Sequence, residues 1–243
     1  MKKNSIFLFF NALSLLLSLS FSACSSDDDE NYNENLPKKV CTNSNSQYDA
    51  QGRLISSSSY KVTYYQDSIV VNSASTADHE FVYIFYLNEK GLIDKYMMSH
   101  YNAALKLGDT YEYNDQNQMC KRGSFECVWK DGNLIQIKDT TNGEIIQSYK
   151  YSDQEYIGNV AEFIGYPDIP SSWCTFLWDY GYFGKRCKNL CIEADFPSLN
   201  MRYFYEYTLD DEGYVSKIKR SYIHPSNGYQ GPTSYINLSY QYL

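Results

Sequence analysis

The chain has 243 residues, of which 29 are acidic and 21 basic, so its formal net charge is −8 at pH 7. This balance argues against a nucleic-acid partner, which needs clustered Lys and Arg to displace counterions from phosphates, and against electrostatic docking on anionic lipid. The 26 tyrosines are typical of β-strands with one wet edge. Length and composition together fit one sizeable β domain.

Residues 1–23 have the pattern of an export signal. A basic start precedes an apolar run over residues 6–21, and two small residues come directly before Cys24. This junction resembles the lipobox of bacterial lipoproteins, with Phe21 where leucine is usual. The resemblance implies that the thiol of Cys24 receives a diacylglyceryl group and that Cys24 becomes the new N-terminus. The alternatives are an ordinary secretory signal and an uncleaved anchor helix, which Asn11 and several serines disfavour.

Residues 24–46 are expected to be a disordered acidic tether, because they are too poor in apolar residues to order themselves. The segment Ser26–Glu30 resembles the acidic signal that directs lipoproteins of the Bacteroidetes to the outer face of the outer membrane. The alternative is a tether that is acidic only to stay solvated. We therefore expect a lipid anchor to hold the protein at the outer membrane, where it is exposed on the cell surface.

A short pattern recurs after the tether: Asp or Asn, two arbitrary residues, Gly or Asn, one more residue, then an aliphatic side chain. The Asp or Asn side chain is expected to cap a type I turn, and the Gly or Asn to adopt the left-handed conformation that closes a hairpin with a bulge. The copies are residues 49–54, 88–93, 114–119 and 210–215, with a degraded copy at 152–157 and a tighter one at 130–134.

Between these turns the chain alternates polar and apolar residues, as in residues 60–64 and 236–242. Residues 81–87 are apolar throughout and predict a strand covered on both faces. We therefore expect an all-β domain over residues 47–243: an antiparallel meander of about a dozen strands that curls into an open, barrel-like sheet. Such curling protects the strand edges. A membrane barrel is disfavoured, because Glu and Lys occur near both faces of many strands.

The hairpins resemble known families. Residues 48–54 match the core of a YD repeat, the hairpin unit of large β-shell proteins, although the spacing here is irregular. As a whole, the chain is similar to a family of Bacteroidetes lipoproteins of unknown function with a porin-like-fold domain. This likeness rests on the Tyr-rich hairpins and on residues 182–190 and 205–218. It implies a fold and an address but no catalytic residue.

Residues 158–201 interrupt the meander and predict an irregular, aromatic-rich insertion near the C-terminal third. A plug or lid across one open end of the sheet would account for its composition. Its aromatic residues are either a helical turn or two packed as core, or a platform for a ligand. The ligand-binding candidates are Trp173, Trp178, Tyr180 and Tyr182.

Six cysteines remain besides Cys24, an even number in an exported chain, which admits disulfides. If Gly123 and Ser124 form a hairpin turn, Cys120 faces Cys127 within disulfide reach while Lys121 faces Glu126. Cys120 and Cys127 are therefore the candidate disulfide. No CxxC pair exists and no His lies within a ligand spacing of a cysteine, so neither a metal site nor a cofactor is expected.

Enzyme chemistry finds little support in the sequence. His79, His100 and His224 stand outside any catalytic motif. Glu112, Glu126 and Glu206 lie between aromatic or apolar neighbours and could supply the paired carboxylates of a glycosidase. Alternation instead places each of them on the face opposite its neighbours, which favours solvated glutamates.

The sequence thus predicts a surface-anchored lipoprotein without enzyme activity. Its membrane contact is the N-terminal lipid, and the β scaffold presents loops and the aromatic insertion to a glycan, a peptide or a partner protein. The alternatives are a polysaccharide-acting hydrolase that uses the strand-borne carboxylates, and a purely structural envelope component.

Overall fold

The computed structural model describes residues 39–41, 46–58, 60–73, 81–100, 103–157 and 174–242. Nearly all of its regular structure is β. The strands of the first half are β1 (Lys39–Cys41), β2 (Gln47–Tyr48), β3 (Leu54–Ser56), β4 (Tyr60–Tyr64), β5 (Ser68–Ser73), β6 (Phe81–Leu87), β7 (Ile93–His100), β8 (Lys106–Tyr113) and β9 (Met119–Arg122). The second half contains β10 (Phe125–Lys130), β11 (Asn133–Asp139), β12 (Ile145–Glu155), β13 (Asn189–Phe196), β14 (Met201–Leu209), β15 (Val215–His224), β16 (Tyr229–Gln230), β17 (Ser234–Asn237) and β18 (Tyr240–Tyr242).

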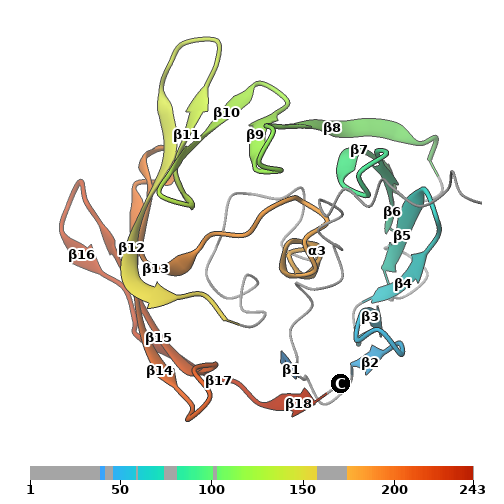
Figure 1. Cartoon of the computed structure of the whole chain (residues 1–243). Coiled ribbons are helices and arrows are strands. Elements are labelled where there is room, and N and C mark those ends of the chain that lie inside the picture. Colours follow the sequence, from blue (N-terminus) through green and yellow to red (C-terminus); the bar gives the residue numbers. More distant parts are fainter. Residues whose placement is uncertain are drawn as a thin grey trace, which may run out of the picture. The chain divides into compact units, whose positions relative to one another are not determined.

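Sixteen strands form one antiparallel sheet in chain order from β2 to β16, with β17 added beside β15. The remaining strands, β1 and β18, pair with each other. The sheet is open and curls around the short helix α3 (Phe176–Asp179), as Figure 1 shows. The predicted all-β meander is confirmed, although the expected dozen strands is too low. Strands of two to four residues, such as β2, β9 and β16, are too short to show an alternating pattern.

Helices have a minor place in the described residues. Besides α3 there is a 3₁₀ turn, η2 (Pro197–Leu199). Among the described residues, no helix is long and apolar enough to cross a membrane.

The recurring turn pattern forms as predicted. In each full copy the first side chain accepts hydrogen bonds from the backbone N–H groups two and four residues later; Asn88 Oδ1, for example, accepts from Lys90 N at 2.9 Å and Leu92 N at 3.0 Å. Gly91 has φ +75°, the left-handed conformation that closes the turn. Asp49, Asn114 and Asp210 cap their turns in the same way.

The two imperfect copies behave differently. Asp131 and Gly132, at φ 51° and 80°, form a two-residue hairpin between β10 and β11, so the tighter copy is a turn. The degraded copy at residues 152–157 is not a turn, because residues 152–155 continue strand β12. It lacks the Gly or Asn that could take the left-handed position.

Each turn is followed by a β-bulge, where the pairing register skips one residue. On β7, for example, Tyr86 pairs with Lys95 while Leu87 pairs with Ile93. The carbonyl just before the skipped residue accepts a hydrogen bond from an aromatic side chain of a later strand. The pairs are Leu54 with Tyr64 (3.1 Å), Ile93 with Tyr113 (2.6 Å), Met119 with Trp129 Nε1 (2.7 Å), Leu134 with Tyr151 (2.6 Å) and Val215 with Tyr240 (2.8 Å). The aromatic donors thus satisfy carbonyls where the bulge disrupts the ladder.

The outer face of the sheet carries rows of alternating charge. Across β8, β9, β10 and β11 the directly opposed residues are Glu112, Lys121, Glu126 and Lys138. Lys121 Nζ lies 3.0 Å from Glu112 Oε1, and on β14 and β15 Lys219 Nζ lies 2.6 Å from Glu206 Oε1. Opposite charges at paired positions stabilise the register.

The insertion is shorter than predicted. Within the predicted 158–201, strand β13 already begins at Asn189, and of the described residues before it only 174–188 lie outside any strand. Leu190 and Cys191 are both buried although they are adjacent in the strand. This pair breaks the alternation of β13 and explains why sequence periodicity misses it.

Candidate functional site

The sheet has two ends, which we name by the connections between strands that each of them carries. The Asx end carries the capped hairpins at residues 49–53, 88–92, 114–118 and 210–214, together with Tyr156 after β12 and Lys188 before β13. The far end carries the opposite connections, among them residues 123–124, 140–144, 197–200 and 225–228.

The described part of the insertion that contains α3, residues 174–188, lies inside the curl of the sheet (Figure 1). Trp178 and Tyr180 are only 1% and 6% exposed. They are therefore core residues and not an open ligand platform, which corrects that prediction for both. The physical reason is the curl itself, which surrounds α3 and packs Phe183 against Phe85 and Tyr111. Tyr182 is partly exposed, and Trp173 lies outside the described residues.

The segment 180–188 crosses the Asx end and bonds to four hairpins in turn. Tyr180 Oη accepts a hydrogen bond from Leu54 N, and Tyr182 O from Ile93 N. Lys185 N then donates to Asn117 O at 2.7 Å, and Lys188 N to Gly132 O at 2.9 Å. The expected plug across one end of the sheet is therefore present in this segment.

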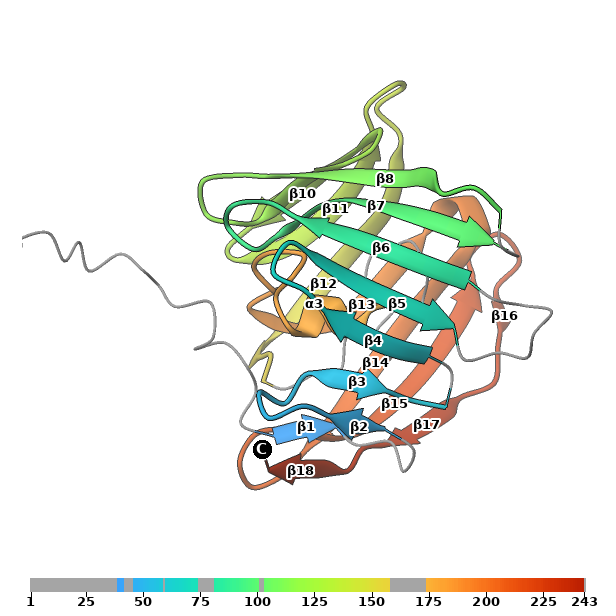
Figure 2. The same cartoon turned by 90° about the vertical axis from the view of Figure 1, so that its right-hand side faces the viewer.

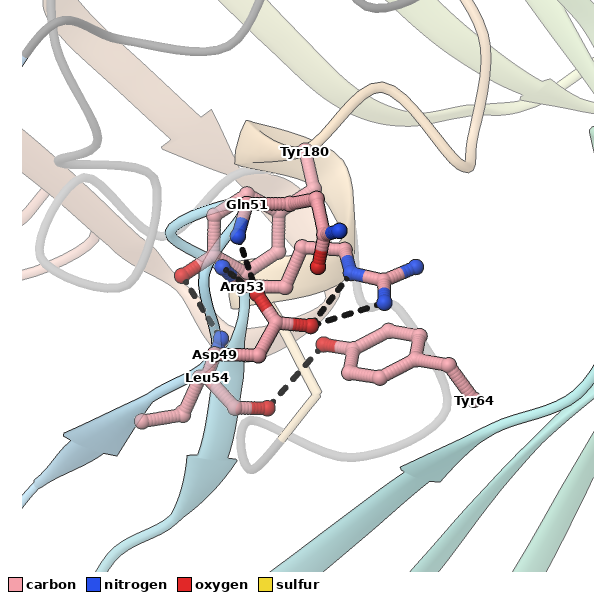
Figure 3. Close-up of polar contacts among 6 residues, drawn as sticks. All are labelled: Asp49, Gln51, Arg53, Leu54, Tyr64 and Tyr180. Atoms are coloured by element: carbon pink, nitrogen blue, oxygen red, sulfur yellow. Dashed lines mark hydrogen bonds and ion pairs between the residues drawn. The ribbon is translucent and has the colours of Figure 1, made fainter. Parts of the chain in front are cut away.

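Arg53 lies in the first hairpin beside this plug; Figure 3 shows its ion pair with Asp49 and the bond from Leu54 N to Tyr180. Its Nε and Nη2 lie 2.8 and 2.7 Å from Asp49 Oδ2, and its guanidinium lies 4.2 Å from the centre of the Tyr64 ring. The Tyr64 ring in turn stacks on Tyr182 at 5.9 Å. Since Asp49 neutralises the guanidinium, this cluster ties the plug to the sheet and is not a charged binding site.

A second cluster lies on the inner face near the far end. Arg122 Nε lies 3.0 Å from Asp109 Oδ2, with side-chain exposures of 19% and 18%. Asp109 pairs with Tyr96 across β7 and β8, and Arg122 pairs with Tyr111 across β8 and β9. An ion pair is thus held between two tyrosine rings on adjacent strands, and we call these four residues the inner cluster.

Two glycines make room for the inner cluster. A Cβ on Gly108 would lie 2.0 Å from the Tyr96 ring, and a Cβ on Gly123 would lie 2.4 Å from Asp109 Oδ1. The Tyr96 ring therefore lies directly against the β8 backbone, and the carboxylate lies against the β9–β10 turn. A side chain at either glycine would have to displace a member of the cluster.

The hydroxyl of Tyr111 has no hydrogen-bond partner among the described residues, although it is buried and the residue is only 4% exposed. Burial raises the pKa of Tyr111 above its ordinary value, and it also raises that of Tyr96, with a smaller contribution from the charge of Asp109. Both hydroxyls thus stay protonated at neutral pH. The cluster thus brings together a carboxylate, a guanidinium and a buried hydroxyl beside two buried rings.

Comparison with known proteins places this fold. Residues 42–217 match a family described as a domain of unknown function (DUF4595) with porin-like fold. The chain belongs to this family. A porin-like protein from Bacteroides uniformis is 17% identical with a TM-score of 0.51, covering 84% of this chain and 94% of that one. A porin-like protein from Bacteroides vulgatus is 14% identical with a TM-score of 0.50, covering 84% and 98%. No curated protein matches the chain.

Membership in the DUF4595 family confirms the resemblance drawn from the Tyr-rich hairpins. At these identities the two solved structures are informative about fold alone. The roles of residues in this family member must therefore be argued from its own geometry.

The three glutamates considered for a glycosidase lie on the outer face. Glu112, Glu126 and Glu206 are exposed, whereas the residues that flank them on the strand point inward or are buried. Glu112 and Glu206 each contact a lysine on the next strand. As predicted, alternation gives them the solvated face.

Cys120 and Cys127 are free thiols, so the candidate disulfide is absent from the structure. The hairpin at Gly123–Ser124 forms, and Lys121 faces Glu126 as predicted. The error arises from a bulge: Glu112 pairs with Lys121 but Tyr113 pairs with Met119, so Cys120 is the skipped residue and leaves the ladder. No group of His, Cys, Asp and Glu within the described ranges is arranged to hold a metal ion.

Sequence reasoning missed the inner cluster. Its one available signal is Gly108, because a glycine inside a strand pattern often marks a bulge or a close approach. Cys24 and His79 lie outside the described residues, so the structure does not bear on either.

Proposed function

We propose that the chain is a lipid-anchored binding protein of the outer membrane, displayed on the cell surface, whose inner cluster takes a glycan. The observation that carries this proposal is the buried Tyr111 hydroxyl beside the Asp109–Arg122 pair, which has no partner among the described residues. A sugar hydroxyl would satisfy it, and the ion pair offers both an acceptor and a donor.

The outer face supports a domain that stands in water. Its strands carry charged pairs such as Glu112–Lys121 and Lys150–Glu193. Charges at such positions are costly where a strand faces lipid. Membrane attachment is then the task of the acyl chains on Cys24, which bind a bilayer almost irreversibly when several are present.

Binding is tested by affinity electrophoresis of the protein in gels that contain starch, xylan or mannan. Wild type should be retarded by at least one polymer, and Asp109→Asn and Tyr111→Phe should lose most of that retardation. The matched control is Glu206→Gln, which removes an equivalent ion pair from the outer face and should leave retardation unchanged. Equal retardation of Asp109→Asn and wild type would show that the inner cluster is not the site.

The hydrolase alternative predicts a different result. If a strand-borne carboxylate were catalytic, the protein would release reducing ends from one of these polymers, and Glu112→Gln or Glu206→Gln would abolish release while binding remained. Because both glutamates contact lysines on the outer face, we expect the wild-type protein to release no reducing ends from these polymers.

The address is tested in cells. Cys24→Ala should abolish incorporation of labelled fatty acid, and protease added to intact cells should remove the domain. Full protection of the domain in intact cells, with digestion after lysis, would contradict surface display.

A further inference from the structure

The inner wall formed by β14 and β15 holds an arginine that has no counter-ion among the described residues. We infer that Arg220 binds the carboxylate or sulfate group of an acidic sugar, so that the glycan taken by this protein carries negative charge. This inference rests on the proposed glycan binding and deepens it, because it names the charge of the ligand and a second contact outside the inner cluster.

Arg220 lies on the inner face of the sheet. It is directly opposite Tyr205 of β14, and opposed residues share one face. Tyr205 is 4% exposed and belongs to the core, and Ile218, two residues before Arg220 and on the same face, is fully buried. Lys219, between them, instead contacts Glu206 on the outer face. Figure 2 shows β14, β15 and β17 as neighbouring strands of one wall.

The charge of Arg220 is not balanced by a neighbour. Arg53, Arg122 and Arg202 each contact a carboxylate at 2.7 to 3.2 Å. In the part of the chain that the structure describes, the guanidinium of Arg220 contacts no carboxylate and donates no hydrogen bond. A partly buried cation without a counter-ion is unfavourable. Because a guanidinium has five donors in a fork that fits an oxyanion, an anionic group of a ligand would balance this charge.

The acidic side chains of this wall lie on its other face. β13 and β14 contain Glu193, Asp195 and Glu206, whereas the described strands β15 and β17 contain no acidic residue. Each of the three carboxylates contacts a lysine or an arginine on the outer face. An anionic ligand at Arg220 would therefore meet no acidic side chain of these four strands on the inner face.

Tyrosine rings hold the surroundings of Arg220 in place. Its guanidinium carbon lies 5.9 Å from the centre of the Tyr203 ring, which lies 5.7 Å from the ring of Tyr222. A Cβ on Gly231 would lie 1.9 Å from Tyr222 Cζ, so the backbone between β16 and β17 lies against the Tyr222 ring. The Tyr222 hydroxyl makes no hydrogen bond to a described residue. It thus offers a donor and an acceptor to a sugar hydroxyl, one same-face position from Arg220.

The inner face of β15 becomes more exposed toward the far end. Ile218 is fully buried, whereas Arg220, Tyr222 and His224 are all partly exposed. Tyr229, which pairs with His224 at the far end, is 55% exposed. We therefore expect a ligand to reach Arg220 from the far end.

Arg220 and the inner cluster are separate contacts. Figure 1 shows β15 on the other side of α3 from β8 and β9, the strands that carry Asp109 and Arg122. The guanidinium of Arg122 is already paired with a carboxylate, whereas that of Arg220 is not. We therefore assign the recognition of hydroxyl groups to the inner cluster and the recognition of charge to Arg220, and each can be removed by its own substitution.

Isothermal titration calorimetry of the purified protein tests the charge preference with matched ligands. One pair is a galacturonic acid trimer and its uncharged methyl ester, and the other is sulfated maltotriose and maltotriose. In at least one pair the charged member should bind at least about tenfold tighter, as expected of a charge-assisted hydrogen bond. The pair that shows the preference identifies the anion as a carboxylate or a sulfate. Equal or weaker binding of the charged member in both pairs would overturn the inference.

Substitutions assign the preference to Arg220. Arg220→Gln should abolish it, and Arg220→Lys, which keeps the charge but loses the planar fork, should retain only part of it. The matched control is Lys219→Gln, which removes the same charge from the adjacent residue on the outer face and should keep the full preference. If Lys219→Gln lowers the preference as much as Arg220→Gln, the effect is one of net charge and Arg220 is not the site.

A variant of the inner cluster separates this inference from the proposed function. If Asp109→Asn abolishes binding of the neutral ligands but wild type shows no preference for the charged ones, glycan binding stands and the role of Arg220 is wrong. If Asp109→Asn binds like wild type while Arg220→Gln loses the preference, the inner cluster is wrong and the role of Arg220 stands.

Nuclear magnetic resonance observes the contact directly and decides the case in which no trimer binds. In protein labelled with nitrogen-15 arginine, the Nε–H signal of Arg220 is identified by its loss in Arg220→Gln. It should shift on addition of glucuronate or glucose sulfate but not of glucose, while the signal of Arg53, which is paired with Asp49, stays in place. The absence of a shift would overturn the inference, as would a shift with inorganic sulfate alone, because the site would then take no sugar.

Discussion

The hydroxyl of Tyr113 donates a 2.6 Å hydrogen bond to the backbone carbonyl of Ile93, the residue that ends the second capped turn. The same relationship occurs at four other bulges, with Trp129 in place of tyrosine at one of them. The high tyrosine content of this chain is therefore partly explained by its turns: each bulge leaves a carbonyl that an aromatic side chain on a later strand can satisfy.

The first prediction concerns this bond. Tyr113→Phe should lower the free energy of unfolding by about 1–2 kcal/mol, because the carbonyl of Ile93 loses its donor in a buried setting. Urea unfolding measures the loss. Tyr65→Phe is the control, since Tyr65 is 58% exposed, and it should change stability by less than about 0.5 kcal/mol. Equal effects of the two variants would mean that the bond adds nothing.

A second prediction uses two glycines with similar backbone conformations. Gly184 (φ +87°) and Gly143 (φ +75°) both lie in the left-handed region, but a Cβ on Gly184 would lie 2.3 Å from Asn117 O whereas one on Gly143 meets nothing within 4 Å. Gly143→Ala should cost only the backbone strain, about 1–2 kcal/mol. Gly184→Ala should cost about 3–5 kcal/mol, because the plug must also move off the third hairpin. Thermal unfolding of both variants measures these losses of stability. Similar losses for the two variants would contradict the tight contact at Gly184.

The buried tyrosines predict unfolding in alkali. Burial raises the pKa of Tyr64, Tyr111, Tyr149, Tyr151 and Tyr207 above the ordinary value. The native state therefore keeps these protons at a pH where the unfolded chain releases them, so stability is full below about pH 10 and falls above it. Each tyrosine contributes a slope of about 1.4 kcal/mol per pH unit.

We therefore expect cooperative unfolding just above pH 10, with tyrosinate absorbance and loss of circular dichroism rising together. Gradual ionisation of most tyrosines in a chain that keeps its β signal would contradict the burial of their hydroxyls.

The cysteines should differ in reactivity. Burial raises the pKa of Cys127 to about 12, and it also raises that of Cys191. Cys120 is only half-buried. In the folded protein at pH 8 a maleimide should label Cys120 first and should label Cys127, Cys174, Cys187 and Cys191 only after unfolding. Peptide mass spectrometry reads the order, and a peptide pair joined through Cys120 and Cys127 would show that the disulfide forms after all.

The turns and the alternation were predictable because their causes are local. Asn88 and Gly91 carry the capping group and the left-handed conformation within four residues, and a strand that alternates shows its faces without any partner. The solvated position of Glu112 followed from the same alternation. In contrast, the Cys120–Cys127 prediction assumed an unbroken ladder, and only the pairing with β8 reveals the bulge that removes Cys120 from it.

The sequence by itself determined the kind of sheet and the places of the capped hairpins, because alternation and hydrogen bonds between near neighbours specify these features. The tertiary structure decided the rest. The Asp109–Arg122 pair joins two different strands, and Tyr64 and Tyr113 bond to carbonyls 10 and 20 residues earlier in the chain. The burial of Trp178 likewise depends on strands far from it in sequence. Their contacts depend on register, curl and the path of the plug, which no local pattern encodes.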